Sequence, residues 1–158
     1  MGMYTEMIVG CALVNLPTAC VEALDYVINK CQNKNKAYQD FIEGKSDISF
    51  EAQDFIKRYD LYYMIYSQSC YFGAPSNVSF STEKWWDSKD IHFLSIRSNC
   101  KNYDGKIQNF LEFLRPYVYE GSGPNNIYGY MHYEEDDFPV IYNTRSQQPI
   151  YIKKDETR

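Results

Sequence analysis

One run of this sequence has the residue types and spacing to bind a cation or a charged partner. It consists of four consecutive carboxylates, Glu134, Glu135, Asp136 and Asp137. They stand between two aromatic segments in YMHYEEDDFPVIY. Oxygen ligands of this kind could hold a divalent cation, but the run lacks the alternating Asp-x-Asp-x-Asp-Gly spacing of a calcium loop. The same charges could form a patch for a basic partner, or simply a solvated hairpin loop. The functional hypothesis is therefore partner binding, and no metal ligand is assigned.

Residues for acid–base or nucleophilic catalysis are sparse. His92 and His132 are the two histidines of the chain and could act as an acid–base pair, but nothing in the sequence brings them together. Cys100 precedes a polar turn and a helix start, a setting that can lower a thiol pKa, yet no histidine is near it in sequence. No GxSxG or Walker motif is present, and Gly121–Gly123 precedes a predicted strand rather than a helix. We assign no catalytic residue and no cofactor, and favour a protein that is not an enzyme.

Aromatic residues are the other unusual signal, because the chain has 16 tyrosines. They gather in residues 62–71 and 128–133, and two tryptophans lie between these segments. Tyr and Trp supply large contact areas in binding interfaces, although Tyr can also replace scarce Leu and Val in a core. Since a single helix layer covers one face of a sheet, part of this aromatic surface is expected to stay available. The predicted partner-contact set is Glu134, Glu135, Asp136, Asp137, Tyr128, Tyr130, His132, Trp85 and Trp86.

Charge and composition exclude several function classes. The chain has 158 residues and a formal net charge of −5, which argues against direct nucleic-acid binding through a basic face. No apolar run approaches the ~18 residues of a membrane span, and the start MGMYTEMIVGCALV lacks the basic region of a signal peptide. Five widely spaced cysteines without a CxxC pair indicate free thiols in a reducing compartment. We predict a cytoplasmic protein, in the host-cell cytosol if it is encoded by a phage.

Hydrophobic periodicity predicts the elements that must position these residues. Apolar side chains three to four residues apart predict two main helices, and alternating patterns predict strands. The expected helices are about 17–32 and 104–118, with Asp104 as the cap of the second, and short helices fall within 33–60. The expected strands are 3–14, 61–72, 78–82, 90–98, 127–133, 139–142 and 149–152, with 61–82 forming a hairpin. This order predicts a single α+β domain, 1–158: a two-layer sandwich with a mostly antiparallel sheet, two main helices on one face and a small helical insert.

Two motifs near the C-terminus resemble a known group of proteins. Asn102-Tyr103-Asp104 opens a helix in SIRSNCKNYDGKIQNFLEFLRPYV, and Gly129–Asp137 form a G-Y-x-x-Y-E-E-D-D hairpin. The segment Ser95–Tyr142 is similar in these motifs to small uncharacterised proteins encoded by bacteriophages and prophages. The resemblance implies a phage-like origin and carries no catalytic motif.

Two classes of function are compatible with these features. The first is a small acidic binding protein that occupies a host protein, such as one that binds nucleic acid; host-defence inhibitors, including anti-CRISPR proteins, act in this way. The second is a protein that binds or sequesters a nucleotide or small ligand, or a small hydrolase acting on a nucleotide signal. In that case aromatic rings would stack on a base, and Arg97 or Arg115 would pair with phosphate. The net charge, the acidic run and the tyrosine-rich segments favour the first class.

Overall fold

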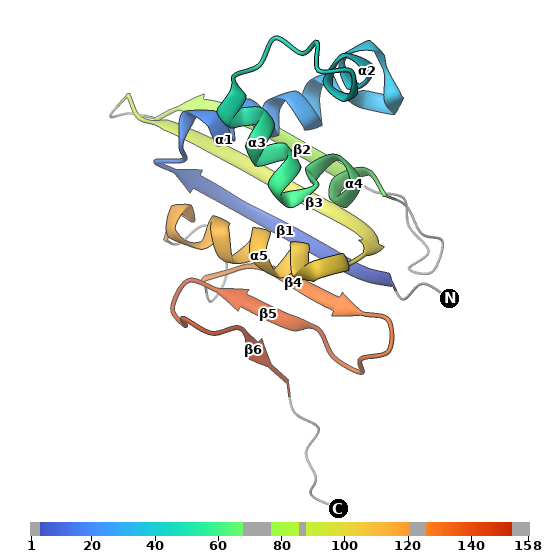
Figure 1. Ribbon diagram of the computed structural model, residues 1–158. Coiled ribbons are helices and arrows are strands. Elements are labelled where there is room, and N and C mark those ends of the chain that lie inside the picture. The colour runs from blue at the N-terminus through green and yellow to red at the C-terminus, as the bar shows by residue number, and fades with distance from the viewer. Residues whose placement is uncertain (1–3, 68–76, 86–87, 121–125, 153–158) are drawn as a thin grey trace, which may run out of the picture.

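A six-stranded sheet forms one layer of the protein (Figure 1). The computed structural model describes residues 4–67, 77–85, 88–120 and 126–152. Within these ranges all five strand pairs are antiparallel, and the spatial order is β2-β3-β1-β4-β5-β6. The strands are β1 Tyr4–Val14, β2 Asn77–Lys84, β3 Asp90–Lys101, β4 Ile127–Tyr133, β5 Val140–Asn143 and β6 Ile150–Tyr151. The predicted α+β class is confirmed.

The helices cover one face of this sheet (Figure 1). They are α1 Thr18–Asp25, α2 Lys36–Ile42, α3 Phe50–Tyr59, α4 Leu61–Tyr66 and α5 Lys106–Leu114, and α1 continues into a π-helical turn at Tyr26–Lys30. The strand order β2-β3-β1-β4, with α1 after β1 and α5 after β3, is the split βαβ plan. Strands β5 and β6 extend this plan at one edge. The described residues place no helix on the opposite face of the sheet, which we call the helix-free face.

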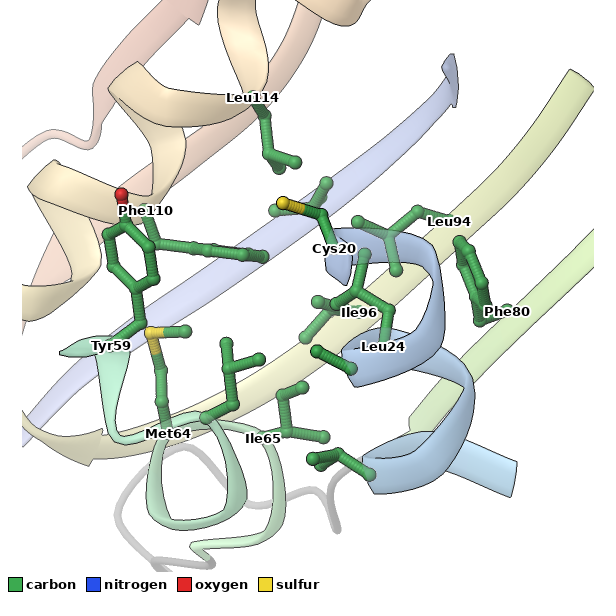
Figure 2. Close-up of a cluster of buried hydrophobic side chains, with 14 of the residues drawn as sticks. Cys20, Leu24, Tyr59, Met64, Ile65, Phe80, Leu94, Ile96, Phe110 and Leu114 are labelled. Carbon is green, nitrogen blue, oxygen red and sulfur yellow. The ribbon is translucent and has the colours of Figure 1, made fainter. Parts of the chain in front are cut away.

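Alternation along β1 separates the two faces. Met7 and Leu13 point toward the helices and are fully buried, as is the apolar stripe of α5, including Phe110 and Leu114. Figure 2 shows side chains from α1, α3, α4 and α5 meeting those of β2 and β3 in this core. The amphipathic pattern of residues 107–114 thus predicted its buried face correctly.

The predicted strand 61–72 is wrong in its first half. Residues 61–66 form α4, whose Leu61, Met64 and Ile65 are at most 1% exposed. The Oγ of Ser98 in β3 donates to the carbonyl of Met64 at 2.8 Å, which ties this helix to the sheet. A short apolar run is compatible with a strand or a helix, and burial of these side chains against the sheet stabilises the helix here. Residues 68–76 lie outside the described part of the chain, so the expected hairpin 61–82 retains only its second strand, in β2.

The start of α5 also differs from the prediction. Asp104 lies in a 3₁₀ turn with φ +56° and does not cap the helix. The N-cap position is Gly105, and Oδ1 of Asn102 accepts a hydrogen bond from the backbone N–H of Ile107 in the first turn at 3.0 Å. The helix then ends at Leu114, four residues before Val118, which forms a bridge to Leu13.

Candidate partner-binding surface

The acidic run lies in the loop that joins β4 to β5, at one end of the sheet. The backbone N–H of Asp136 donates to the Tyr133 carbonyl at 3.0 Å, which closes a turn, and that of Glu134 donates to the Tyr4 carbonyl at 3.0 Å. The side chains of Glu135, Asp136 and Asp137 are exposed, and Glu134 is half-buried. These two hydrogen bonds therefore fix the backbone of the loop, while three of its four acidic side chains are exposed.

His132 holds this loop against the helix-free face. Its Nε2 lies 2.9 Å from the carbonyl oxygen of Asp136. A carbonyl only accepts hydrogen bonds, so Nε2 carries the proton in this contact. The predicted contact residue His132 thus positions the acidic turn.

Apolar side chains lie directly beside the acids. Asp136, Asp137, Phe138, Pro139, Val140, Tyr151 and Ile152 line an open groove of about 300 Å³, which we call the hairpin groove. Phe138, Tyr151 and Ile152 are 40%, 66% and 43% exposed. The sequence analysis did not select these residues. Tyr151 lies in the short strand β6, Ile152 follows it, and Phe138 lies in the loop before β5.

The acids also act on Tyr133, the last residue of β4. Desolvation, together with the carboxylates of Glu135, Glu134 and Asp136, raises the pKa of its hydroxyl, since a second negative charge there is unfavourable. The loop therefore presents a negative field next to an apolar groove. This combination suits a basic partner with apolar side chains.

The remaining predicted contact residues lie outside the acidic turn. Tyr128 is closed to a partner, because it is 2% exposed and its hydroxyl donates to the Leu111 carbonyl of α5 at 2.8 Å. The prediction that Tyr128 contacts a partner is therefore wrong. Tyr130 lies on the helix-free face, half-buried, with its hydroxyl 3.5 Å from Glu6 Oε1. The half-buried Trp85 packs edge-to-face on Tyr119 at 5.6 Å.

Trp86 lies outside the described residues. Of the predicted contact residues that the structure describes, the acidic run and His132 lie together at one end of the sheet, and Tyr130 lies on the face beside them. Tyr128 lies beneath α5.

The two histidines cannot act together. His92 faces the helix layer, stacks on Phe80 at 5.7 Å and has its Nδ1 2.8 Å from Thr82 Oγ1. His132 shares the opposite face with Glu6, one strand beyond β1. Burial lowers the pKa of His92, which favours the neutral ring.

Cys100 does not have the lowered thiol pKa that its position before a helix start could have produced. The thiol is buried in the core, and desolvation, with a smaller effect of Asp60, raises its pKa to about 12. A thiol with that pKa is a poor nucleophile near neutral pH. Cys11, Cys20 and Cys31 are likewise free and buried.

The two arginines proposed to bind phosphate in the nucleotide alternative do not lie together in one site. Arg97 turns toward a carboxylate, with its Nη2 3.4 Å from Glu6 Oε2. Arg115 lines a separate open cavity of about 530 Å³ together with Pro116 and Glu120. Within the described ranges, no group of three or more His, Cys, Asp or Glu side chains could hold a metal ion. In the same part of the chain, no helix is long and apolar enough to cross a membrane.

Comparison with known proteins found no matching family, no similar curated protein and no similar solved structure.

Proposed function

We propose that this protein is a non-enzymatic binding protein that docks a basic, apolar segment of another protein in the hairpin groove. The observation that carries the proposal is the position of the acidic turn beside Phe138, Tyr151 and Ile152. Exposed aromatic and aliphatic side chains next to a charged rim are typical of protein-binding surfaces. The rim charges speed encounter, and the apolar groove slows dissociation.

The class of partner follows from charge and from the phage-like motifs. A negative surface competes with nucleic acid for a basic face, so the proposed partner is a host protein that binds nucleic acid. Resemblance to phage proteins supports a role in the host cytosol, and inhibition of a host-defence protein is the specific form that we propose.

The proposal is tested with two variants of equal charge. The hairpin variant changes Glu134, Glu135, Asp136 and Asp137 to their amides, which moves the formal net charge from −5 to −1. The control variant makes the same change at the exposed acids Glu43, Glu51, Asp54 and Glu112 of the helical side. A third variant, Tyr151→Ser, alters the groove without changing charge.

The measurement has two steps. Proteins captured by the wild type from a bacterial lysate are identified by mass spectrometry, and the most abundant is purified for binding kinetics at low and physiological salt. We expect the hairpin variant to associate ~10-fold more slowly at low salt, with a smaller salt dependence. Tyr151→Ser should mainly speed dissociation, and the control variant should behave as the wild type.

Equal slowing in the hairpin and control variants would show that net charge, and not the hairpin, matters. Unchanged kinetics in both the hairpin and Tyr151→Ser variants would reject the groove. The nucleotide alternative is tested by thermal shift with mono-, di- and cyclic nucleotides, because a ligand that binds the native state raises the unfolding temperature. A clear shift there would favour nucleotide binding over protein binding.

A further inference from the structure

A second polar cluster lies on the helix-free face of the sheet. Glu6 of β1 stands directly opposite Asn99 of β3 and His132 of β4. Directly opposite residues in neighbouring antiparallel strands share a face, with Cβ atoms about 4.5–5.5 Å apart. The three side chains therefore form one row across three strands, which we call the Glu6 row.

Two hydrogen-bond acceptors of this row are poorly satisfied. The Glu6 side chain is 10% exposed, and its contacts are 3.4 Å from Arg97 Nη2 and 3.5 Å from Tyr130 OH. Both exceed the roughly 2.7–3.2 Å of ordinary hydrogen bonds. Asn99 is 3% exposed, and its buried Oδ1 has no hydrogen-bond partner among the described residues. Because buried polar atoms are nearly always paired, these two side chains can accept hydrogen bonds that the described residues do not supply.

The side chains of the Glu6 row determine which kind of hydrogen-bond donor fits there. A carboxylate and an amide oxygen next to each other accept hydrogen bonds and favour positive charge, so a cation with several N–H bonds fits this row best. A planar guanidinium offers five donors and stacks on aromatic rings, whereas an ammonium is a compact, strongly hydrated charge. The nearby Arg97 already brings a guanidinium to Glu6, and Tyr130 supplies a ring on the same face. A divalent metal is disfavoured because no group of three or more His, Cys, Asp or Glu side chains among the described residues could hold one.

We propose that the Glu6 row is a binding subsite for one guanidinium group of a ligand, which replaces Arg97 at the carboxylate of Glu6. The side chain of Arg97 is 49% exposed, so it can turn into solvent without opening the core. It thus acts as an internal competitor. The guanidinium comes either from a free small molecule or from an arginine side chain of a partner. The subsite shares no side chain with the hairpin groove and does not depend on the proposed function.

The test is titration calorimetry with ethylguanidinium and with the peptide acetyl-Gly-Arg-Gly-amide. Ethylurea and the citrulline peptide are the matched uncharged probes. The variants are Glu6→Gln, Arg97→Ala and, as a control, Glu83→Gln, an exposed acid of β2 on the same face. We expect saturable binding to the wild type and to Glu83→Gln, at least ~10-fold weaker binding to Glu6→Gln, and at least ~10-fold tighter binding to Arg97→Ala. The uncharged probes should not bind.

Each outcome is decisive. Absence of saturable binding, or equal affinity of Glu6→Gln and the wild type, would overturn the subsite. If Glu6→Gln does not fold, Arg97→Ala still decides, because binding no tighter than the wild type would contradict competition by Arg97. Tighter binding of the peptide than of ethylguanidinium would assign the group to a protein partner, and equal binding would assign it to a small molecule. Tyr151→Ser alters the hairpin groove without changing charge, so it should bind ethylguanidinium like the wild type, and the subsite and the groove can fail separately.

Discussion

Replacing Phe110 by Ala should strongly destabilise the protein, because this ring lies at the centre of the core. Phe110 is fully buried, and its ring lies 5.7 Å from that of Tyr59 in an edge-to-face arrangement (Figure 2). Losing about 100 Å² of apolar burial at ~25 cal/mol/Å² removes roughly 2.5 kcal/mol. The cavity and the lost ring contact bring the total to about 3–5 kcal/mol.

Urea denaturation measures this effect, with Phe50→Ala as the matched control. Phe50 is 79% exposed at the start of α3, so the same substitution there should change the free energy of unfolding by less than about 0.5 kcal/mol. Equal denaturant slopes for the variants and the wild type would show that the unfolded states are comparable. A loss below ~1 kcal/mol for Phe110→Ala, or equal losses at both positions, would refute the description of α5 as the centre of the core.

Two further predictions follow from particular contacts. An added Cβ at Gly129 would lie 2.8 Å from the Ile8 carbonyl oxygen and 3.1 Å from Leu111 Cδ2, whereas at Gly10 it would meet no described atom within 4 Å. Urea denaturation should therefore show a loss of ~1–3 kcal/mol for Gly129→Ala and less than about 0.5 kcal/mol for Gly10→Ala; similar values would contradict the packing of β4 under α5. For pH, burial lowers the pKa of His92 below its ordinary value of 6.5, so the unfolded chain binds more protons as the pH falls from about 7.5 to about 5.5. The wild type should therefore lose more stability over this range than His92→Gln, and parallel losses measured by urea midpoint would show that the ring is not buried neutral.

The sequence predicted the strands that carry the candidate surface to within one residue at each end. The alternating patterns of residues 127–133 and 139–142 placed β4, β5 and the acidic loop between them correctly. What it could not supply was the neighbour of that loop. Tyr151 and Ile152 reach the acidic turn because β6 pairs with β5, and this pairing joins residues that no local pattern connects.

On the helix-free face, too, the sequence could not show which residues of different strands lie together. Nothing in the sequence singled out Glu6, which follows Thr5 in an ordinary strand pattern. It becomes distinctive because register sets Asn99 and His132 directly opposite it. A shift of one residue would move all three to other faces or other partners.

The sequence by itself determined the α+β class, the acidic hairpin and the buried stripe of α5, because these depend on periodicity and turn chemistry within a few residues. Tertiary structure alone decided that residues 61–66 form a helix and that Tyr128 lies beneath α5. It also alone decided that His92 and His132 face opposite sides. The physical reason is that burial and cross-strand register arise from contacts between distant segments, and the free energy of those contacts overrides weak local preferences.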